Sequence, residues 1–216
     1  MGEHQVQKVP LPSIRRYPLY LRLLKAHLEE GEKWISSTEI ARVLNLKPIQ
    51  VRKDMACTGI GGKPRIGFAL EPLIFAIEQL LGWDNATDAI LVGAGNLGSA
   101  LTGYHGFDQY GLKIAAVFDN NPEKIGTMIN GVRVFAMGEM PEMVSTLSVR
   151  MAVLTVPAEH AQEVALSLVN AGILGIWNFS VQALNLPSHI IVQRTDLAVS
   201  FAELSARLIK EIRKKT

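Results

Sequence analysis

The chain has 216 residues, 48 % of them hydrophobic, and a formal net charge of +2, so it can form one large globular domain or two modest ones. No stretch resembles a secretory signal, and no apolar run approaches the length of a membrane span. The single cysteine, Cys57, excludes an intramolecular disulfide framework and favours a reducing compartment, so we expect a cytoplasmic protein with no membrane partner.

Basic residues are concentrated in the N-terminal part of the chain. Residues 1–82 carry 12 Lys and Arg against 8 Asp and Glu, whereas residues 83–216 carry 10 against 12. Within residues 42–65, Asp54 is the one acidic residue among the cations Arg42, Lys47, Arg52, Lys53, Lys63 and Arg65. Such a run is usually a solvated surface, and it indicates a nucleic-acid partner only where a motif places it on a binding face.

The first predicted elements are helices. Residues 1–11 have no periodic pattern and are expected to form a mobile arm. From Pro12, apolar residues spaced by three and four predict a helix that ends at Gly31; they are Ile14, Tyr17, Leu21, Leu24 and Leu28. Pro18 is either a first-turn proline or a kink, so the pattern leaves the start of this helix open.

Two short helices joined by a tight turn are predicted next. Ser36 and Glu39 have the spacing of a capping box, in which the serine caps the third amide and the glutamate reaches back. That helix runs to about Leu44, and Pro48 suits the first position of a second helix, which Gly59 stops. The pair is a candidate helix-turn-helix, and the alternative is a small helical bundle with no ligand.

The second of these helices has one apolar and one polar face. Val51 and Met55 are expected in the core, whereas Gln50, Lys53 and Asp54 are expected to point outward, with Arg52 on the flank. Polar and basic side chains on such a helix can reach base edges and phosphates in a major groove.

A basic hairpin is predicted after the helix pair. Residues 59–70 form a Gly/Pro turn between two short extended pieces, with Lys63 and Arg65 near its tip. Because a helix-turn-helix followed by a basic hairpin is a winged helix, we predict a DNA-binding domain over residues 1–82, which a helix from Pro72 to Gly82 completes. We assign its DNA contacts to Ser36, Lys47, Gln50, Arg52, Lys53, Lys63 and Arg65.

A glycine-rich turn follows the next apolar run, Ala89 to Val92. It comprises Gly93, Ala94, Gly95, Asn96, Leu97 and Gly98, and a helix-compatible stretch begins at Ser99. A second apolar run ends in Asp119, at the distance typical of a dinucleotide-binding unit, where the carboxylate would accept hydrogen bonds from the adenosine ribose and favour NAD over NADP. A glycine loop that serves packing alone is the alternative for the bare motif.

Strands and helices alternate through the rest of the chain. Strands are predicted near residues 132–135, 151–156, 173–177 and 190–193, and helices over 139–147 and 158–170. This alternation predicts an α/β fold with a parallel sheet, so residues 83–193 are expected to form a Rossmann domain.

The last helix, within residues 194–216, is amphipathic. Its apolar stripe comprises Leu197, Phe201, Leu204, Leu208 and Ile212. The Rossmann domain is already complete before this helix begins. The helix therefore either covers its own sheet or docks on a second subunit.

Several short segments, spread over nearly the whole chain, recur in a fixed order and spacing in one protein family. They are Ser36-Ser37, Gln50 to Asp54, the glycines around Gly61 and Gly67, Val92 to Gly98, Phe118 to Pro122, Thr155 to Ala158, Ala161-Gln162, Ala171 to Ile173, Asn178-Phe179 and Asp196-Leu197. Together they resemble the redox-sensing repressor family called Rex. The resemblance implies a transcriptional repressor that senses the ratio of NADH to NAD⁺. It implies a homodimer with a domain-swapped C-terminal helix that binds an inverted repeat of double-stranded operator DNA and releases it when NADH binds.

The resemblance also assigns residues to two sites. It adds Thr155, Val156, Pro157, Asn178 and Phe179 to the nucleotide-binding residues. It implies a switch formed by Arg22, Tyr104 and Asp196, in which the acidic side chain exchanges partners between the arginine and the tyrosine.

A small NAD-dependent oxidoreductase is the rival hypothesis. It would need a general acid or base and a substrate pocket, yet only about two dozen residues follow the predicted sheet. His105 and His160 could lie near the nucleotide, but neither has an identifiable partner carboxylate, so both are expected on the surface. Cys57 is expected to serve packing, and no Cys/His grouping predicts a metal site. A nucleotide- or CoA-binding subunit of a larger enzyme would explain the glycine loop but not the basic hairpin. We therefore expect a regulator and not an enzyme.

Overall fold

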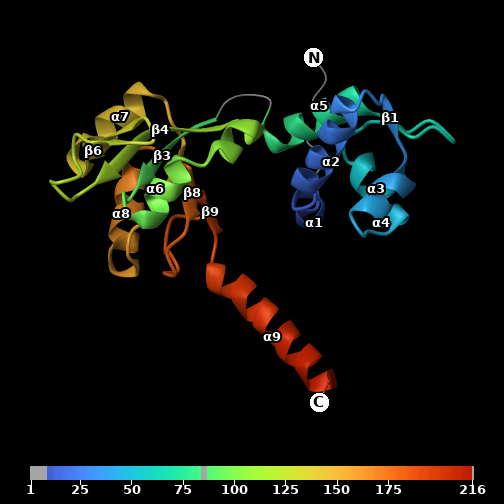
Figure 1. Cartoon of the computed structure of the whole chain (residues 1–216). Helices are drawn as coiled ribbons and strands as arrows, with labels where there is room; N and C mark the ends of the chain where they lie inside the picture. The colour runs from blue at the N-terminus through green and yellow to red at the C-terminus, as the bar shows by residue number, and fades with distance from the viewer. Residues whose placement is uncertain (1–8, 84–86, 216) are drawn as a thin grey trace. The chain divides into compact units, whose positions relative to one another are not determined.

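The computed structural model describes residues 9–83 and 87–215. Most of the predicted N-terminal arm lies outside these residues, and its last residue, Leu11, already begins a helix. The chain divides into two compact units, unit 1 (Met1–Asn85) and unit 2 (Ala86–Thr216) (Figure 1). The domain boundary predicted after residue 82 falls three residues before this division.

Unit 1 is mostly helical. In chain order it contains α1 (Leu11–Ile14), α2 (Tyr17–Glu29), β1 (Trp34–Ile35), α3 (Ser37–Val43), α4 (Pro48–Ala56), β2 (Phe68–Ala69) and α5 (Leu70–Leu81). Its core is built from α2, α3, α4 and α5, with the tyrosines Tyr17 and Tyr20 fully buried.

The region predicted to be helical between Pro12 and Gly31 contains two helices, α1 and α2, and Pro18 is a first-turn proline of the second, one of the two roles left open for it. Pro18 has no N–H and its ring would clash with the carbonyl of the preceding turn, so it is accommodated only in the first turn of a new helix. Ile14, the first residue of the predicted apolar spacing, lies in α1 and is 37 % exposed.

The predicted helix-turn-helix is confirmed as α3 and α4. The turn between them places Asn45 in the left-handed region at φ 53°, and Pro48 occupies the first position of α4. The Ser36 hydroxyl caps α3 by accepting the N–H of Glu39 at 3.0 Å. Only this half of the predicted capping box forms, because the Glu39 carboxylate accepts hydrogen bonds from Arg42 instead of reaching back.

The predicted hairpin is smaller than its sequence suggests. Lys63 and Gly67 form an isolated bridge, and β2 pairs not with a hairpin arm but with β1, a two-residue strand that the sequence analysis missed. Gly67 has φ 108°, and a Cβ there would lie 2.2 Å from the carbonyl oxygen of Ile35. We call this hairpin region, residues 59–70, the wing. The wing needs glycine at position 67, where its backbone passes β1.

Unit 2 is a layered α/β domain. Its elements are β3 (Thr87–Val92), α6 (Asn96–Thr102), the 3₁₀ helix η1 (His105–Tyr110), β4 (Leu112–Asp119), β5 (Met128–Ile129), β6 (Val132–Ala136), the 3₁₀ helix η2 (Met137–Glu139), α7 (Met140–Thr146), β7 (Met151–Leu154), α8 (Ala158–Asn170), β8 (Gly175–Asn178), β9 (Ile191–Arg194) and α9 (Leu197–Lys215).

The sheet of unit 2 has the strand order β5-β6-β4-β3-β7-β8-β9. All neighbouring strands are parallel except β5, a short edge strand antiparallel to β6 that the sequence did not reveal. Along β3, Ala89 and Leu91 pack on one side, and Ile90 and Val92 pack on the other. Because both faces of the sheet are covered here, β3 is continuously apolar from Ala89 to Val92, and the predicted Rossmann fold is confirmed.

Helix α9 does not bury its apolar stripe. The exposed fractions are 65 % for Leu197, 70 % for Phe201, 64 % for Leu204 and 57 % for Leu208. The alternative in which this helix covers its own sheet is therefore wrong (α9 is red in Figure 1). In the part of the chain that the structure describes, no helix has the length and apolarity needed to cross a membrane.

The close approach of Gly67 to β1 can be tested by substitution. Gly67→Ala is expected to lower the free energy of unfolding of unit 1 by about 3 kcal/mol, because a Cβ would strain the backbone and strike Ile35. Gly59→Ala is the matched control: Gly59 has φ 75° but no atom within 4 Å of an added Cβ, so the expected loss is about 1 kcal/mol. Urea unfolding followed by circular dichroism measures both, and equal losses would contradict a specific role for the contact.

Candidate functional site

A cleft of about 660 Å³ opens in unit 2 beside the carboxyl ends of β3, β4 and β7. At this point the strand order reverses, and in open parallel sheets the reversal is where ligands bind. The lining residues are Val92, Gly93, Gly95, Leu97, Asp119, Asn120, Asn121, Lys124, Met137, Thr155, Val156, Pro157, Ala158, His160, Val164, Phe179, Ser180 and Val181.

The three glycines of the loop between β3 and α6 have different tasks. Gly93 has φ 105°, and a Cβ there would lie 2.8 Å from the carbonyl oxygen of Thr155. A Cβ on Gly98 would lie 1.9 Å from the carbonyl oxygen of Gly93, so this glycine lets α6 pack on the loop. Gly95 has no atom within 4 Å of an added Cβ, so its missing side chain leaves open space in the cleft. That is the arrangement expected of a loop whose backbone is approached by a phosphate.

Asp119, at the end of β4, joins two loops of the cleft. Its carboxylate accepts the backbone N–H of Ala94 at 2.7 Å and that of Asn121 at 2.8 Å, and the Lys124 ammonium lies 3.4 Å away. Burial raises the pKa of Asp119, but the two amides and Lys124 outweigh burial and hold the pKa below its usual value. The side chain is thus a buried anion that fixes the glycine loop, a task the sequence analysis did not assign to it.

Most of the predicted nucleotide-binding residues line this cleft, but four do not: Ala94, Asn96, Gly98 and Asn178. Asn178 is 1 % exposed; its Oδ1 accepts the N–H and hydroxyl of Ser180, and its Nδ2 donates to the carbonyl of Gln182. It therefore shapes the loop whose residues Phe179 and Ser180 reach the cleft.

Several cleft residues were missed. Asn120, Asn121 and Lys124 directly follow the predicted acidic residue, and their proximity in sequence was the signal that could have found them. Met137, His160 and Val164 come from η2 and α8, and only the crossover topology brings them to the site.

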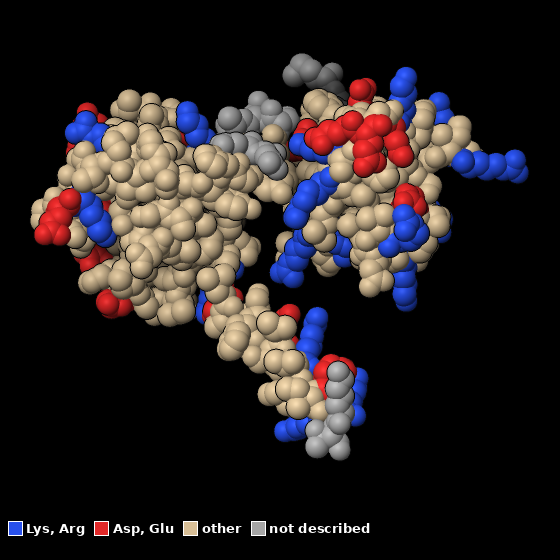
Figure 2. Space-filling model, viewed as in Figure 1, with Lys and Arg blue, Asp and Glu red and all other residues tan. Residues whose placement is uncertain are grey.

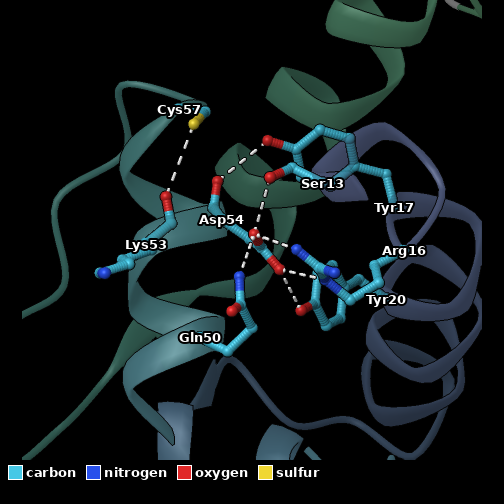
Figure 3. A network of polar contacts seen from close by, with 8 residues as sticks. All are labelled: Ser13, Arg16, Tyr17, Tyr20, Gln50, Lys53, Asp54 and Cys57. Atoms are coloured by element: carbon cyan, nitrogen blue, oxygen red, sulfur yellow. Dashed lines mark hydrogen bonds and ion pairs between the residues drawn. The ribbon is translucent and has the colours of Figure 1, made fainter. Parts of the chain in front are cut away.

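In unit 1, the recognition-helix candidate α4 is anchored by a buried carboxylate. Asp54 is fully buried and accepts hydrogen bonds from Ser13 Oγ at 2.8 Å, Arg16 Nε at 2.6 Å and Nη2 at 2.8 Å, Tyr20 Oη at 2.6 Å and Gln50 Nε2 at 3.1 Å (Figure 3). A carboxylate has about four lone-pair sites, so its acceptor capacity is filled. The bidentate pair with Arg16 ties α4 to the start of α2.

The expectation that Asp54 points outward is wrong. Its partners Ser13, Arg16 and Tyr20 lie 34–41 residues earlier in the chain, so no local pattern in α4 reveals them. Burial raises the pKa of Asp54, but hydrogen bonds from Arg16, Tyr20, Ser13 and Gln50 outweigh burial and lower it. Burial and the bond to Asp54 raise the pKa of Tyr20, so its hydroxyl stays a donor.

The residues predicted to contact DNA differ in how exposed their side chains are. Lys47, Arg52, Lys53 and Arg65 are exposed, and Figure 2 shows basic side chains projecting from unit 1. Lys63 lies over the Trp34 ring, with its ammonium 4.6 Å from the ring centre. Gln50 is half-buried beside Asp54, and the Ser36 hydroxyl already caps α3. Cys57 donates to the Lys53 carbonyl at 3.5 Å, as suits a structural residue.

The three predicted switch residues lie on different elements. Arg22 is exposed on α2 of unit 1. Tyr104 is 56 % exposed after α6 in unit 2 and packs edge-on against Phe107, with the ring centres 4.9 Å apart. Asp196 accepts from Arg194 at 3.0 Å and from the N–H of Ala198 at 3.0 Å, which caps α9. The exchange of partners remains a prediction.

Comparison with known proteins agrees with this division of the chain. Residues 8–56 match the family model described as "Putative DNA-binding protein N-terminus", and residues 84–182 match "CoA binding domain". The chain is 46 % identical over 203 residues to the redox-sensing transcriptional repressor Rex of Treponema denticola, covering 94 % of this chain and 97 % of the relative.

Solved structures of RSP, a Rex-family repressor, are also similar over nearly the full length. The complex of RSP with β-NAD⁺ and operator DNA superposes with a TM-score of 0.88 at 33 % identity, covering 96 % of this chain and 95 % of RSP. The complex of RSP with β-NADH gives a TM-score of 0.85 at 32 % identity, with coverages of 97 % and 98 %.

The buried anion in α4 predicts a large effect of a small substitution. Asp54→Asn is expected to lower the free energy of unfolding of unit 1 by about 3 kcal/mol at neutral pH, because Arg16 loses its counter-charge. The ionised form of Asp54 stabilises unit 1 above the ordinary carboxyl pKa of about 3.9, and this contribution is lost as pH falls through the lower folded-state pKa. On acidification, the free energy of unfolding should therefore fall less for Asp54→Asn than for the wild type.

Glu39→Gln serves as the control for that measurement. Glu39 pairs with Arg42 on the exposed face of α3, so its replacement should change stability little. Urea unfolding at neutral and acidic pH measures all three proteins, and a small loss for Asp54→Asn would contradict the anchoring role.

Proposed function

The chain belongs to the Rex family of redox-sensing transcriptional repressors, and on this premise we propose how its two units work. As a homodimer, it binds an inverted-repeat operator through unit 1 and releases the DNA when NADH binds in unit 2. The observation that carries the proposal is the pairing, in one chain, of a dinucleotide-type cleft with a basic helix-turn-helix.

The nucleotide is proposed to lie across the cleft, as the topology of unit 2 supports. Its pyrophosphate would approach the backbone N–H groups at Gly95 to Leu97, because Gly95 leaves open space at the start of this segment. The adenosine ribose would meet Asp119, whose charge disfavours a 2′-phosphate. The nicotinamide would then extend toward Thr155, Val156 and Phe179.

The DNA is proposed to meet unit 1 on α4 and the wing. Arg52 and Lys53 project from α4 and would contact phosphates or bases, and Arg65 at the wing tip and Lys47 would neutralise phosphates. The salt dependence of binding should then reflect the number of phosphates contacted.

Dimerisation is proposed to bury α9. The exposed stripe on this helix has the spacing of an interface helix, and a second copy of the chain is the occupant that closed symmetry provides. In the dimer, the Asp196 carboxylate would pair with Arg22 in one state and with Tyr104 in the other. This exchange would link nucleotide binding to the position of unit 1. We also place the protein in the cytoplasm, where a bacterial-type repressor meets its operator and a single thiol stays reduced.

An oxidoreductase is not favoured, because the relatives over nearly the whole chain are repressors. The titratable side chains that line the cleft are Asp119, Lys124 and His160, and Asp119 and Lys124 are paired with each other. The nucleotide thus serves as a signal whose redox state is sensed.

Fluorescence anisotropy with an inverted-repeat operator tests the function. NADH should weaken DNA binding by about 100-fold, a coupling of about 2.7 kcal/mol, whereas NAD⁺ should leave the complex in place. If NADH does not change the affinity for DNA, the sensor function fails.

The open space at Gly95 predicts a variant that folds but does not bind nucleotide. Gly95→Ala is expected to weaken NADH binding about tenfold or more, since overpacking costs about 1–3 kcal/mol, with unchanged stability. Gly138→Ala, another glycine with open space but outside the cleft, should bind normally. Calorimetry measures both, and normal NADH affinity of the Gly95 variant would remove the loop from the site.

The role of α9 predicts a change in oligomeric state. A chain that ends at Asp196 is expected to sediment as a monomer, because the stripe from Leu197 to Leu208 is absent. Lys210→Ala, on the polar face of α9, should remain dimeric. A stable dimer of the shortened chain would show that the interface lies elsewhere.

A further inference from the structure

One face of α4 is exposed along its whole length, and it is not uniformly polar. The residues on this face are Ile49, Arg52, Lys53 and Ala56, which recur at the three- and four-residue spacing of a helix. The opposite face carries Val51, Asp54 and Met55, each fully buried. Ile49 is 53 % exposed and lies in the first turn of α4.

The structure fixes the outward orientation of Ile49. Asp54 is held by five hydrogen bonds from Ser13, Arg16, Tyr20 and Gln50, so a rotation of α4 about its axis would uncover a buried charge. Ile49 therefore stays on the surface in the free protein, next to two cations and without the burial that would favour an isoleucine at this position.

We propose that Ile49 reads a thymine in the operator by packing on the C5-methyl group in the major groove. This inference rests on the proposed DNA binding by α4. The first turn of a recognition helix is the part that contacts base edges. The thymine methyl is the apolar group that the major groove offers, and apolar side chains recognise it by contact.

The positive charge on the exposed face of α4 favours DNA as the partner that covers it. Arg52 and Lys53 lie one helical turn after Ile49, so a partner that covers this face must bring negative charge beside a small apolar group. A thymine beside its phosphates has this chemistry, whereas an apolar protein surface would leave both cations unpaired.

Removal of single methyl groups from the DNA tests the proposal. An operator is selected from random duplexes with the full-length protein, and each thymine of one half-site is then replaced by deoxyuridine, which differs only by the methyl. At one thymine, the replacement should weaken binding of the wild type about fourfold, the ratio expected for one buried methyl group. Replacement in both half-sites should multiply the effect.

Protein variants assign the effect to Ile49. Ile49→Ala should bind thymine and deoxyuridine operators equally at that position, whereas Leu19→Ala, an exposed leucine of α2, should keep the wild-type ratio. Equal wild-type affinity for all thymine and deoxyuridine operators overturns the proposal, as does a fourfold ratio that persists in Ile49→Ala. Failure to select any bound duplex would instead refute the proposed DNA binding itself.

Discussion

The buried carboxylate of Asp54 is the interaction on which the DNA-binding unit depends. An isolated charge at this position would be strongly unfavourable, and it is tolerated only because Arg16 supplies the counter-charge and hydroxyl and amide donors fill the remaining acceptor sites. The donors outside α4 are Ser13 on α1, Arg16 at the N-cap of α2 and Tyr20 on α2, so they fix both the position of α4 and its rotation. Which side chains face outward is therefore decided inside unit 1.

A second buried aspartate has the same task in unit 2. Asp119 holds the glycine loop through Ala94 and the loop after β4 through Asn121. The cleft is thus already shaped before a ligand enters, which limits the entropy lost on binding. The two units share a principle: an anion inside the fold sets the geometry of the surface that recognises the ligand.

Local patterns allowed most of the fold to be predicted, and contacts distant in sequence account for the failures. The glycine loop, the strand before it and the acid at the end of β4 lie within about thirty residues, so their spacing predicts the Rossmann unit. By contrast, β1 has only two residues, too few for a periodic pattern, and it is a strand only because it pairs with β2. Asp54 was misplaced because three of its donors, Ser13, Arg16 and Tyr20, lie far from it in sequence. Met137 and His160 reach the cleft only through the topology. The partner of α9 and the contacts of the switch residues are proposed to involve a second chain. Contacts between chains leave no local pattern in the sequence, so their geometry could not be predicted from it.

The central claim is that nucleotide binding in unit 2 and DNA binding in unit 1 are coupled. Linkage requires the coupling to be reciprocal, so NADH should bind more weakly to the operator complex than to the free protein, by the same factor by which it weakens DNA binding. Isothermal titration of NADH into the protein, with and without saturating operator duplex, measures this factor directly. An equal NADH affinity in the two titrations would contradict the account.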